Sequence, residues 1–329
     1  MQTDLLMTAT VGERDKSITR AVELLRKGEI VALPTETVYG LAADTLNPIA
    51  VAKIFEAKGR PRFDPLIVHL PEQDWLAKIT DLPAQDRQLI LQLAKKFWPG
   101  PLTLVLPKRQ IVPEIATAGL DTVAVRISAH PIFAEIVQAF GKPLAAPSAN
   151  RFGRISPTIA KHVRDELDGH IPLIIDAGPT THGIESTIVA VGDGKIDILR
   201  RGPVTLEQLS AFGEVGVATE REKISAPGQL PSHYAPKTPL RIIDDLKSFA
   251  PETNRRCALL AWNSMGKDKR FVAIRNLSEQ HDLREAAANL FRYLRELDAL
   301  DVDLIVAERV PLEGLGAAIS DRLHRASHV

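Results

Sequence analysis

The segment Lys58-Gly59-Arg60-Pro61-Arg62 places three cationic side chains within five residues. Its glycine and proline disfavour a regular helix, so we expect a loop that can direct these side chains toward one point. Arginine binds oxyanions through two parallel hydrogen bonds, and lysine neutralises them as a point charge. The segment therefore suits a polyphosphate or a carboxylate. The alternative interpretation is a solvated basic turn.

Further polar residues fall at the ends of predicted strands or in loops that interrupt apolar runs. In open α/β sheets such positions line the ligand crevice. Each residue also has a structural interpretation: His69 could be a hydrogen-bonded core histidine, Arg126 an outward strand position, and Ser148 or Asn150 a cap. The candidates are Thr35, Lys58, Arg60, His69, Thr122, Arg126, Ser148, Asn150, Ser156, Ser186 and Arg200.

Familiar glycine-rich nucleotide motifs are missing from the sequence. It contains neither G-x-x-x-x-G-K-[ST] nor G-x-G-x-x-G, and it has no nucleophile elbow of the G-x-S-x-G type. If the protein uses ATP, it binds the phosphates without either of the two common glycine-rich loops.

The elements that must position these residues alternate irregularly between strand and helix. Helical spacing predicts a helix at 48–57 that leads into Lys58, and a further helix is expected to begin at Ser156-Pro157. This alternation predicts an α/β domain with a mixed sheet. The other predicted helices are 85–97 and 131–140, and the predicted strands are 29–33, 66–70, 102–106, 122–127, 173–176, 186–191 and 196–199.

A change of composition after about Phe212 predicts a second domain. Residues 219–240 carry charges and prolines without an apolar period, as interdomain linkers do. Strand-like runs at 240–243, 257–261 and 302–307 then accompany helical stretches at 277–300 and 316–326. We therefore expect a domain at 1–212, a linker at 213–239 and an α/β domain at 240–329.

The overall composition is that of an ordinary globular protein. Its 329 residues include 41 Lys+Arg and 41 Asp+Glu, so the formal net charge is zero and any basic site must be local. Cys257 is the single cysteine, which rules out an intramolecular disulfide and a cysteine-cluster zinc site. The sequence shows no secretory signal pattern and no apolar run of membrane-spanning length, so we expect a cytoplasmic protein.

Five motifs in order resemble the YrdC-like family. They are Leu33-Pro34-Thr35-Glu36-Thr37-Val38-Tyr39-Gly40-Leu41, Lys58-Gly59-Arg60-Pro61, Pro65-Leu66-Ile67-Val68-His69, Trp98-Pro99-Gly100-Pro101-Leu102-Thr103 with Val125-Arg126, and Pro147-Ser148-Ala149-Asn150. The family's K-x-R and S-x-N signature stands here as Lys58, Arg60, Ser148 and Asn150. One departure is Arg62-Phe63-Asp64, which fills a place where members often have a small residue and Asn.

The C-terminal third resembles the longer, two-domain form of that family. Pro227-Gly228 and Ser232-His233-Tyr234-Ala235-Pro236 resemble its linker, and Gly314–Ile319 with Asp321-Arg322-Leu323 resembles the end of its second domain. The resemblance implies a YrdC-like twisted mixed open sheet with flanking helices, plus a smaller C-terminal Rossmann-like α/β domain. It also implies that the linker folds across the site as a lid, with Tyr234 near the nucleotide.

The activity that the resemblance implies is L-threonylcarbamoyladenylate synthesis from L-threonine, bicarbonate and ATP, with Mg²⁺ held by the ATP phosphates. The product would feed tRNA threonylcarbamoyladenosine modification through a partner that transfers it. Family positions imply threonine binding by Thr35, His69, Arg126, Ser186 and the backbone of Ala146. They imply nucleotide binding by Lys58, Arg60, Thr122, Ser148, Ser156, Arg200 and Tyr234, with Asn150 in the phosphate region.

Two other functions remain open from the residues. A carbamoyltransferase acting through carbamoyl-AMP is one, although its relatives carry zinc-finger-like modules whose cysteines this chain lacks. The other is a double-stranded-RNA binder without catalysis, whose affinity would fall steeply with salt.

Overall fold

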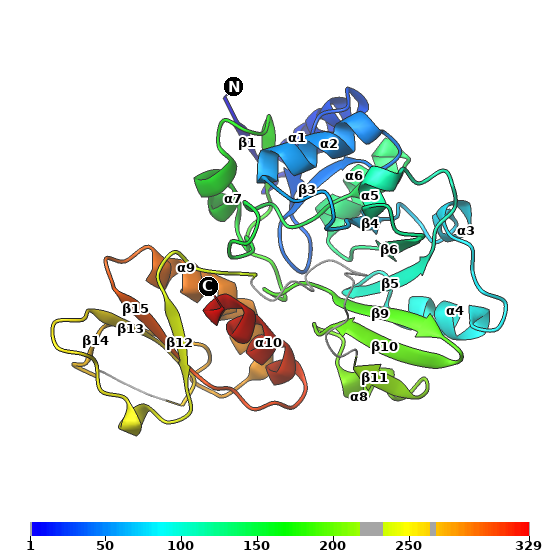
Figure 1. Ribbon diagram of the computed structural model, residues 1–329. Helices are drawn as coiled ribbons and strands as arrows, with labels where there is room; N and C mark the ends of the chain where they lie inside the picture. Colours follow the sequence, from blue (N-terminus) through cyan, green and yellow to red (C-terminus); the bar gives the residue numbers. More distant parts are fainter. Residues whose placement is uncertain (1, 218–232, 264–267, 329) are drawn as a thin grey trace. The chain divides into compact units, whose positions relative to one another are not determined.

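The computed structural model describes residues 2–217, 233–263 and 268–328 (Figure 1). The chain forms two compact units, each described by itself below. The first comprises residues 1–152, 157–181 and 185–229, and the second comprises 153–156, 182–184 and 230–329. Most of the predicted linker, including Pro227, Gly228 and Ser232, lies outside the described residues. No helix in the described ranges is long and apolar enough to cross a bilayer.

The first unit is built on one mixed sheet of eleven strands in the order β1-β8-β2-β3-β7-β4-β6-β5-β9-β10-β11 (Figure 1). Parallel pairs such as β4 with β6 alternate with antiparallel pairs such as β5 with β6, which confirms the predicted mixed α/β sheet. The strands are β1 (Asp4–Met7), β2 (Val31–Leu33), β3 (Gly40–Asp44), β4 (Ile67–His69), β5 (Leu102–Pro107), β6 (Thr122–Arg126), β7 (Leu144–Ala145), β8 (Leu173–Asp176), β9 (Thr187–Gly192), β10 (Lys195–Arg200) and β11 (Val215–Val217).

Helices cover the two faces of this sheet unequally. One face packs along its length against residues of α2, α4 and α7, among others. The opposite face packs against α1 and α6, but only over its β1, β8, β2, β3 and β7 part. The helices are α1 (Val11–Arg26), α2 (Pro48–Lys58), α3 (Trp75–Ile79), α4 (Arg87–Phe97), α5 (Glu114–Thr117), α6 (Pro131–Phe140), α7 (Ala160–Leu167) and α8 (Leu206–Leu209).

Over the remaining half of that second face, the sheet carries a small apolar cluster of its own. It consists of Ile67, Val105, Ala124, Ile188 and Leu199, from five adjacent strands. All five side chains are at least nine-tenths buried. None of them belongs to the cores under α1, α2, α4 or α6. We call this cluster the apolar floor, and the candidate site is built around it.

The second unit contains a parallel sheet of four strands in the order β12-β15-β13-β14. Helix α9 packs on β13 and β14, and α10 packs on α9 and β12. This confirms the expected smaller α/β domain. Its elements are β12 (Leu240–Ile243), the short 3₁₀ helix η1 (Leu246–Ser248), β13 (Cys257–Ala261), β14 (Phe271–Asn276), α9 (Leu283–Asp298), β15 (Leu304–Glu308) and α10 (Leu315–Ser327).

Two short segments from the first two-thirds of the sequence belong to this second unit. The N–H of Ala235 donates to the carbonyl of Gly153 at 2.8 Å, and the guanidinium of Arg295 in α9 donates to the carbonyl of Ile155. Gly183 lies so close to α9 that a Cβ there would be 2.5 Å from the Cα of Ala288. Segments 153–156 and 182–184 therefore pack with the C-terminal elements.

Two local predictions were wrong, and one strand was missed. Lys58 is not in a loop but is the last residue of α2, because Gly59 adopts the left-handed conformation that ends the helix only after it. The helix expected at Ser156-Pro157 begins at Ala160 instead. Strand β3 was not predicted, since its Gly-Leu-Ala-Ala-Asp sequence has neither β-branched residues nor alternation.

Candidate active site

Helix α2 delivers Lys58 into the interior of the first unit. The side chain of Asn47 caps the first turn by accepting from the N–H groups of Ile49 and Ala50, and Pro48 fits the first helical position. Lys58 falls on the buried face of the helix and is only 3% exposed. A helix end thus positions this cation more rigidly than a basic loop would.

The ammonium group of Lys58 joins the two halves of the K-x-R and S-x-N signature. It donates to the carbonyl oxygen of Ser148 at 2.6 Å and to that of Asn150 at 2.5 Å. The N–H of Phe152 in turn donates to the Lys58 carbonyl at 2.9 Å. Burial first, and the nearby charge of Arg60 second, lower the pKa of Lys58 to about 7. This lysine is therefore poised to gain a proton when an anion arrives.

Arg60 is held within its own loop. Its Nε donates to the carbonyl of Asp64 at 3.1 Å and its Nη2 to the carbonyl of Pro65 at 2.8 Å. The same Nη2 lies 2.9 Å from Oδ2 of Asp64, and both side chains are nearly inaccessible, at 5% and 1% exposure. Arg62, by contrast, is exposed, which agrees with its position outside the signature.

A row of polar residues crosses five adjacent strands just beyond the apolar floor. His69 and Arg126 are register partners at the ends of β4 and β6. Thr103 on β5 accepts from or donates to Ser186 at 2.8 Å, immediately before β9. Arg200, at the end of β10, donates to the Ser186 carbonyl and hydroxyl, both at 3.1 Å. Four of these five residues were predicted from the sequence, and their strand-end positions bring them into one line.

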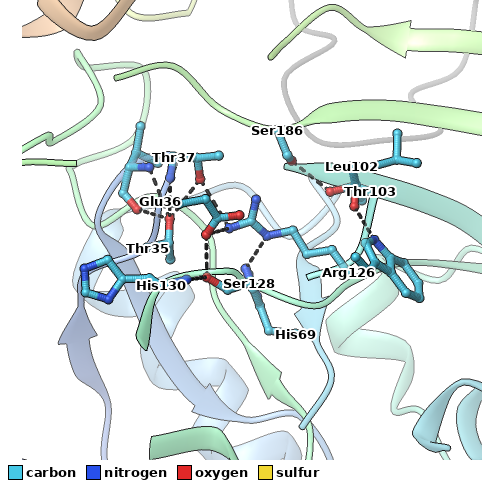
Figure 2. A network of polar contacts seen from close by, with 12 residues as sticks. Thr35, Glu36, Thr37, His69, Leu102, Thr103, Arg126, Ser128, His130 and Ser186 are labelled. Carbon is cyan, nitrogen blue, oxygen red and sulfur yellow. Dashed lines mark hydrogen bonds and ion pairs between the residues drawn. The ribbon is translucent and has the colours of Figure 1, made fainter. Parts of the chain in front are cut away.

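Arg126 is the centre of a buried network, shown in Figure 2. Its Nη2 lies 3.3 Å from Oε2 of Glu36 and donates to Thr37 Oγ1 at 3.2 Å. Ser128 donates to the same Glu36 oxygen at 2.5 Å. The guanidinium is 2% exposed, yet its Nη1 has no hydrogen-bond partner among the described residues. A buried donor of this kind suits an incoming carboxylate, which would satisfy it.

His69 supports Arg126 from the neighbouring strand. Its Nε2 accepts a hydrogen bond from Arg126 Nε at 2.9 Å (Figure 2). Its ring centroid lies 4.8 Å from that of Phe133 in α6. Burial and the charge of Arg126 hold the pKa of His69 well below its ordinary value. The imidazole is therefore neutral at physiological pH, so it orients the guanidinium without placing a second positive charge beside it.

Thr122 lies at the opposite end of β6 from Arg126, on the same face of the sheet, because side chains four residues apart on a strand share a face. Four residues at about 3.3 Å each separate them by about 13 Å. Ala124 of the apolar floor lies between the two. A flat apolar ring could rest on this floor between the polar row and Thr122.

The other predicted residues have more local roles in the structure. The Thr35 hydroxyl donates to the Val38 carbonyl at 2.6 Å and shapes the 35–38 turn, while the N–H of Ala146 is bonded to the Ile67 carbonyl at 2.9 Å. Ser156 and Tyr234 belong to the second unit. There the Tyr234 ring stacks at 5.3 Å on Phe291.

Several residues of the site were missed by sequence reasoning. They are Glu36, Thr37, Asp64, Thr103 and Ser128. Glu36 and Thr37 stand inside the Leu33–Leu41 motif, and Asp64 lies four residues after Arg60, so the sequence shows both acids near candidate residues but not which arginine each one pairs with. The described residues contain no group of three or more His, Cys, Asp or Glu side chains arranged to hold a metal ion.

Two protein-family profiles match the chain almost from end to end. The family described as "Telomere recombination" matches residues 23–202. The family described as "Threonylcarbamoyl-AMP synthase, C-terminal domain" matches residues 204–328.

Known proteins resemble the chain over its whole length. Threonylcarbamoyl-AMP synthase of Bacillus subtilis is 40% identical over 98% of this chain and 96% of its own length. That of Pyrococcus abyssi is 38% identical over 98% of both proteins. A crystal structure of P. abyssi Sua5 complexed with L-threonine has a TM-score of 0.89 at 37% identity, covering 99% of this chain and 98% of that one. The chain therefore belongs to the two-domain, Sua5-type family of threonylcarbamoyl-AMP synthases, which are nucleotidyltransferases.

Proposed function

We propose that this chain makes threonylcarbamoyl-AMP and pyrophosphate from L-threonine, bicarbonate and ATP. The observation that carries the proposal is the buried Nη1 donor of Arg126, which lacks a partner among the described residues, in the same unit as the Lys58, Arg60 and Arg200 cations. A carboxylate site at Arg126, a group of cations for phosphates and an apolar floor match an amino acid and a nucleotide.

The chemistry requires two bonds to form. The threonine amine adds to bicarbonate with loss of water, which gives an N-carboxylate. A carboxylate oxygen then attacks the α-phosphorus of ATP, and the bond to pyrophosphate breaks. Both partners in the second step are anions, so their approach needs cations and positioning rather than a covalent nucleophile. This requirement agrees with the absence of a nucleophile elbow from the sequence.

The residues take distinct roles in this scheme. Arg126, oriented by His69 and Glu36, binds the threonine carboxylate, and Ser186 with Thr103 limits the space beside it. Lys58 and Arg200 face the phosphates, while the adenine rests on the apolar floor toward Thr122. The backbone of the Ala146–Asn150 segment lines the region where the two substrates meet. Lys58 holds this segment in place through its hydrogen bonds to the Ser148 and Asn150 carbonyls.

Magnesium is expected to arrive on the β and γ phosphates. Mg²⁺ keeps several waters and is commonly held by substrate phosphates with few protein carboxylates. The charged side chains around the phosphate region include the cations Lys58, Arg60 and Arg200 and the buried carboxylate of Asp64. The ion would neutralise charge on the leaving pyrophosphate.

The part of the predicted 213–239 linker that follows β11 is proposed to act as a lid that keeps water from the labile carbamate, with Ser156 and Tyr234 reaching the nucleotide. Deleting residues 225–237 should abolish turnover while the first unit stays folded by circular dichroism. Full activity of this deletion would contradict the lid. The product would pass to the machinery that modifies tRNA, and we propose that the reaction takes place in the cytoplasm.

Isotope labelling tests the proposed reaction. With ¹³C-bicarbonate, the label should appear in an AMP-linked product by mass spectrometry only when threonine is also present. A labelled AMP adduct that forms without threonine would instead indicate carboxy-AMP formation from bicarbonate and ATP alone.

A further inference from the structure

Asp64 is an unusual anion within the proposed phosphate site. It lies in the short loop between α2 and β4, where its N–H donates to the Pro61 carbonyl at 3.2 Å and closes a turn. The turn brings the carboxylate against Arg60, with Oδ2 at 2.9 Å from Nη2. Asp64 is 1% exposed, so water does not stabilise its charge.

The carboxylate is held by charge and not by hydrogen bonds. Neither oxygen accepts a hydrogen bond with acceptable geometry from any described residue, although the Arg60 Nη2 is close. A structural buried carboxylate normally accepts several. Asp64 thus has two oxygens whose lone pairs the loop does not use.

The charges of three cations act on this carboxylate. Burial raises the pKa of Asp64, and the charges of Arg60, Lys58 and Arg200 act in the opposite direction, in that order. These are the three cations proposed to bind the triphosphate, and they come from α2, its following loop and β10. Glu166 is the other acid whose charge acts on Lys58. Asp64 is therefore a buried anion among the cations of the proposed phosphate site.

We propose that Asp64 is a positioning residue that stands in for a phosphate group in the empty site and releases Arg60 to the nucleotide when ATP binds. The inference rests on the proposed function, because it takes ATP as the ligand. Before the nucleotide binds, the ion pair with Asp64 adds to the hydrogen bonds that the Arg60 guanidinium donates to the Asp64 and Pro65 carbonyls, and together they keep it folded into the loop. Phosphate oxygens then replace the carboxylate as the partner of Arg60.

The replacement of Asp64 by phosphate as the partner of Arg60 changes the protonation of Asp64. A buried carboxylate that loses its arginine and gains phosphate neighbours is disfavoured in its charged form. Asp64 therefore takes up a proton from solvent as the nucleotide binds, and its COOH group can donate a hydrogen bond to a phosphate oxygen. Lys58 takes up a second, separate fraction of a proton, since an anion favours its charged form.

The Asp64→Asn variant distinguishes proton uptake by Asp64 from proton uptake by Lys58. Asparagine keeps the shape of the side chain and an oxygen for Arg60, but it has no charge to displace and no proton to gain. The matched control is Asp86→Asn, which changes another buried carboxylate, 2% exposed, whose oxygen accepts from the Gly194 N–H at 2.8 Å.

Calorimetric titration with α,β-methylene-ATP, without threonine, tests the inference in two buffers of different ionisation enthalpy at pH 7.5. The wild-type protein should bind with net proton uptake. Asp64→Asn should bind about tenfold more tightly and take up fewer protons, while Asp86→Asn should match wild type. Unchanged proton uptake in Asp64→Asn, or an affinity that is equal or weaker, overturns the inference and leaves the proposed function intact. Failure of the wild-type protein to bind the analogue overturns both.

Discussion

The ammonium group of Lys58 contacts the backbone of Asn150, with its nitrogen 2.5 Å from the carbonyl oxygen. These residues are 92 positions apart in the sequence and occupy the end of α2 and the loop after β7. The contact, together with that to Ser148, means that one cation both fixes the backbone of the S-x-N segment and lies in the proposed phosphate region. Lys58 thus holds the backbone of the S-x-N segment in place and also supplies positive charge to the proposed phosphate region.

Replacing Lys58 with alanine should lower the turnover rate at least a hundredfold. Loss of one preorganised charge contact to the reacting phosphates costs about 3 kcal/mol of transition-state stabilisation. Steady-state pyrophosphate release measures the effect. The control is Lys161→Ala, which removes an exposed lysine paired with Asp165 on α7 and should leave the rate unchanged. A near-wild-type rate for Lys58→Ala would mean that Lys58 supports the backbone of the S-x-N segment but does not contribute to catalysis.

The pH profile of kcat/KM for ATP should fall as the pH rises above about 7. Burial and Arg60 lower the pKa of Lys58 to about 7, so the free protein loses this cation above that pH, whereas below it the cation is present. Because kcat/KM reports ionisations of the free enzyme, this decline should appear there. Lys58→Arg, whose charge does not titrate in this range, should show a lower but flat profile. An alkaline decline that persists in Lys58→Arg would assign it to another group.

Arg126 should control the affinity for threonine more than that for ATP. Arg126→Ala removes a charge-assisted contact worth about 1.5–3 kcal/mol, so KM for threonine should rise roughly ten- to hundredfold while KM for ATP changes little. Arg109→Ala, at an exposed arginine paired with Asp81, serves as the control. Equal increases in both KM values would show that Arg126 acts only by supporting the fold.

Two glycines with the same strained backbone should tolerate alanine very differently. Gly178 and Gly183 both have positive φ, at 82° and 68°, so alanine pays the same left-handed penalty of about 1 kcal/mol at either site. A Cβ at Gly178 meets nothing within 4 Å, but at Gly183 it would lie 2.5 Å from the Ala288 Cα and 2.6 Å from the Ala287 carbonyl. Thermal unfolding should therefore show a clearly larger loss for Gly183→Ala. Equal losses would mean that the close packing on α9 contributes no stability.

The sequence predicted most elements of the fold because their patterns are local. Strands 173–176, 240–243 and 257–261 and helix 131–140 have the predicted bounds, since apolar runs and proline or glycine punctuation define them. Strand β3 was missed because tertiary pairing with β2 and β7, and not residue propensity, makes Gly40–Asp44 extended. Segments 153–156 and 182–184 were assigned to the first domain by position, since sequence order does not reveal which unit they pack against.

For the site, the sequence predicted the residue types but not their partners. His69, Arg126, Ser186 and Arg200 were chosen at strand ends, and register then places them side by side. The acids that pair with the arginines, Glu36 and Asp64, could not be paired from sequence alone because the turns that bring them back depend on the fold. The roles of all these residues as ligands of threonine and ATP stay predictions.

Release of pyrophosphate from ATP tests the central claim most directly. The purified full-length protein should release pyrophosphate when threonine, bicarbonate and ATP are all present. It should release almost none when threonine is omitted or when bicarbonate is removed by degassing. Release at an undiminished rate without threonine would contradict the assignment of this chain as a threonine-dependent adenylate synthase.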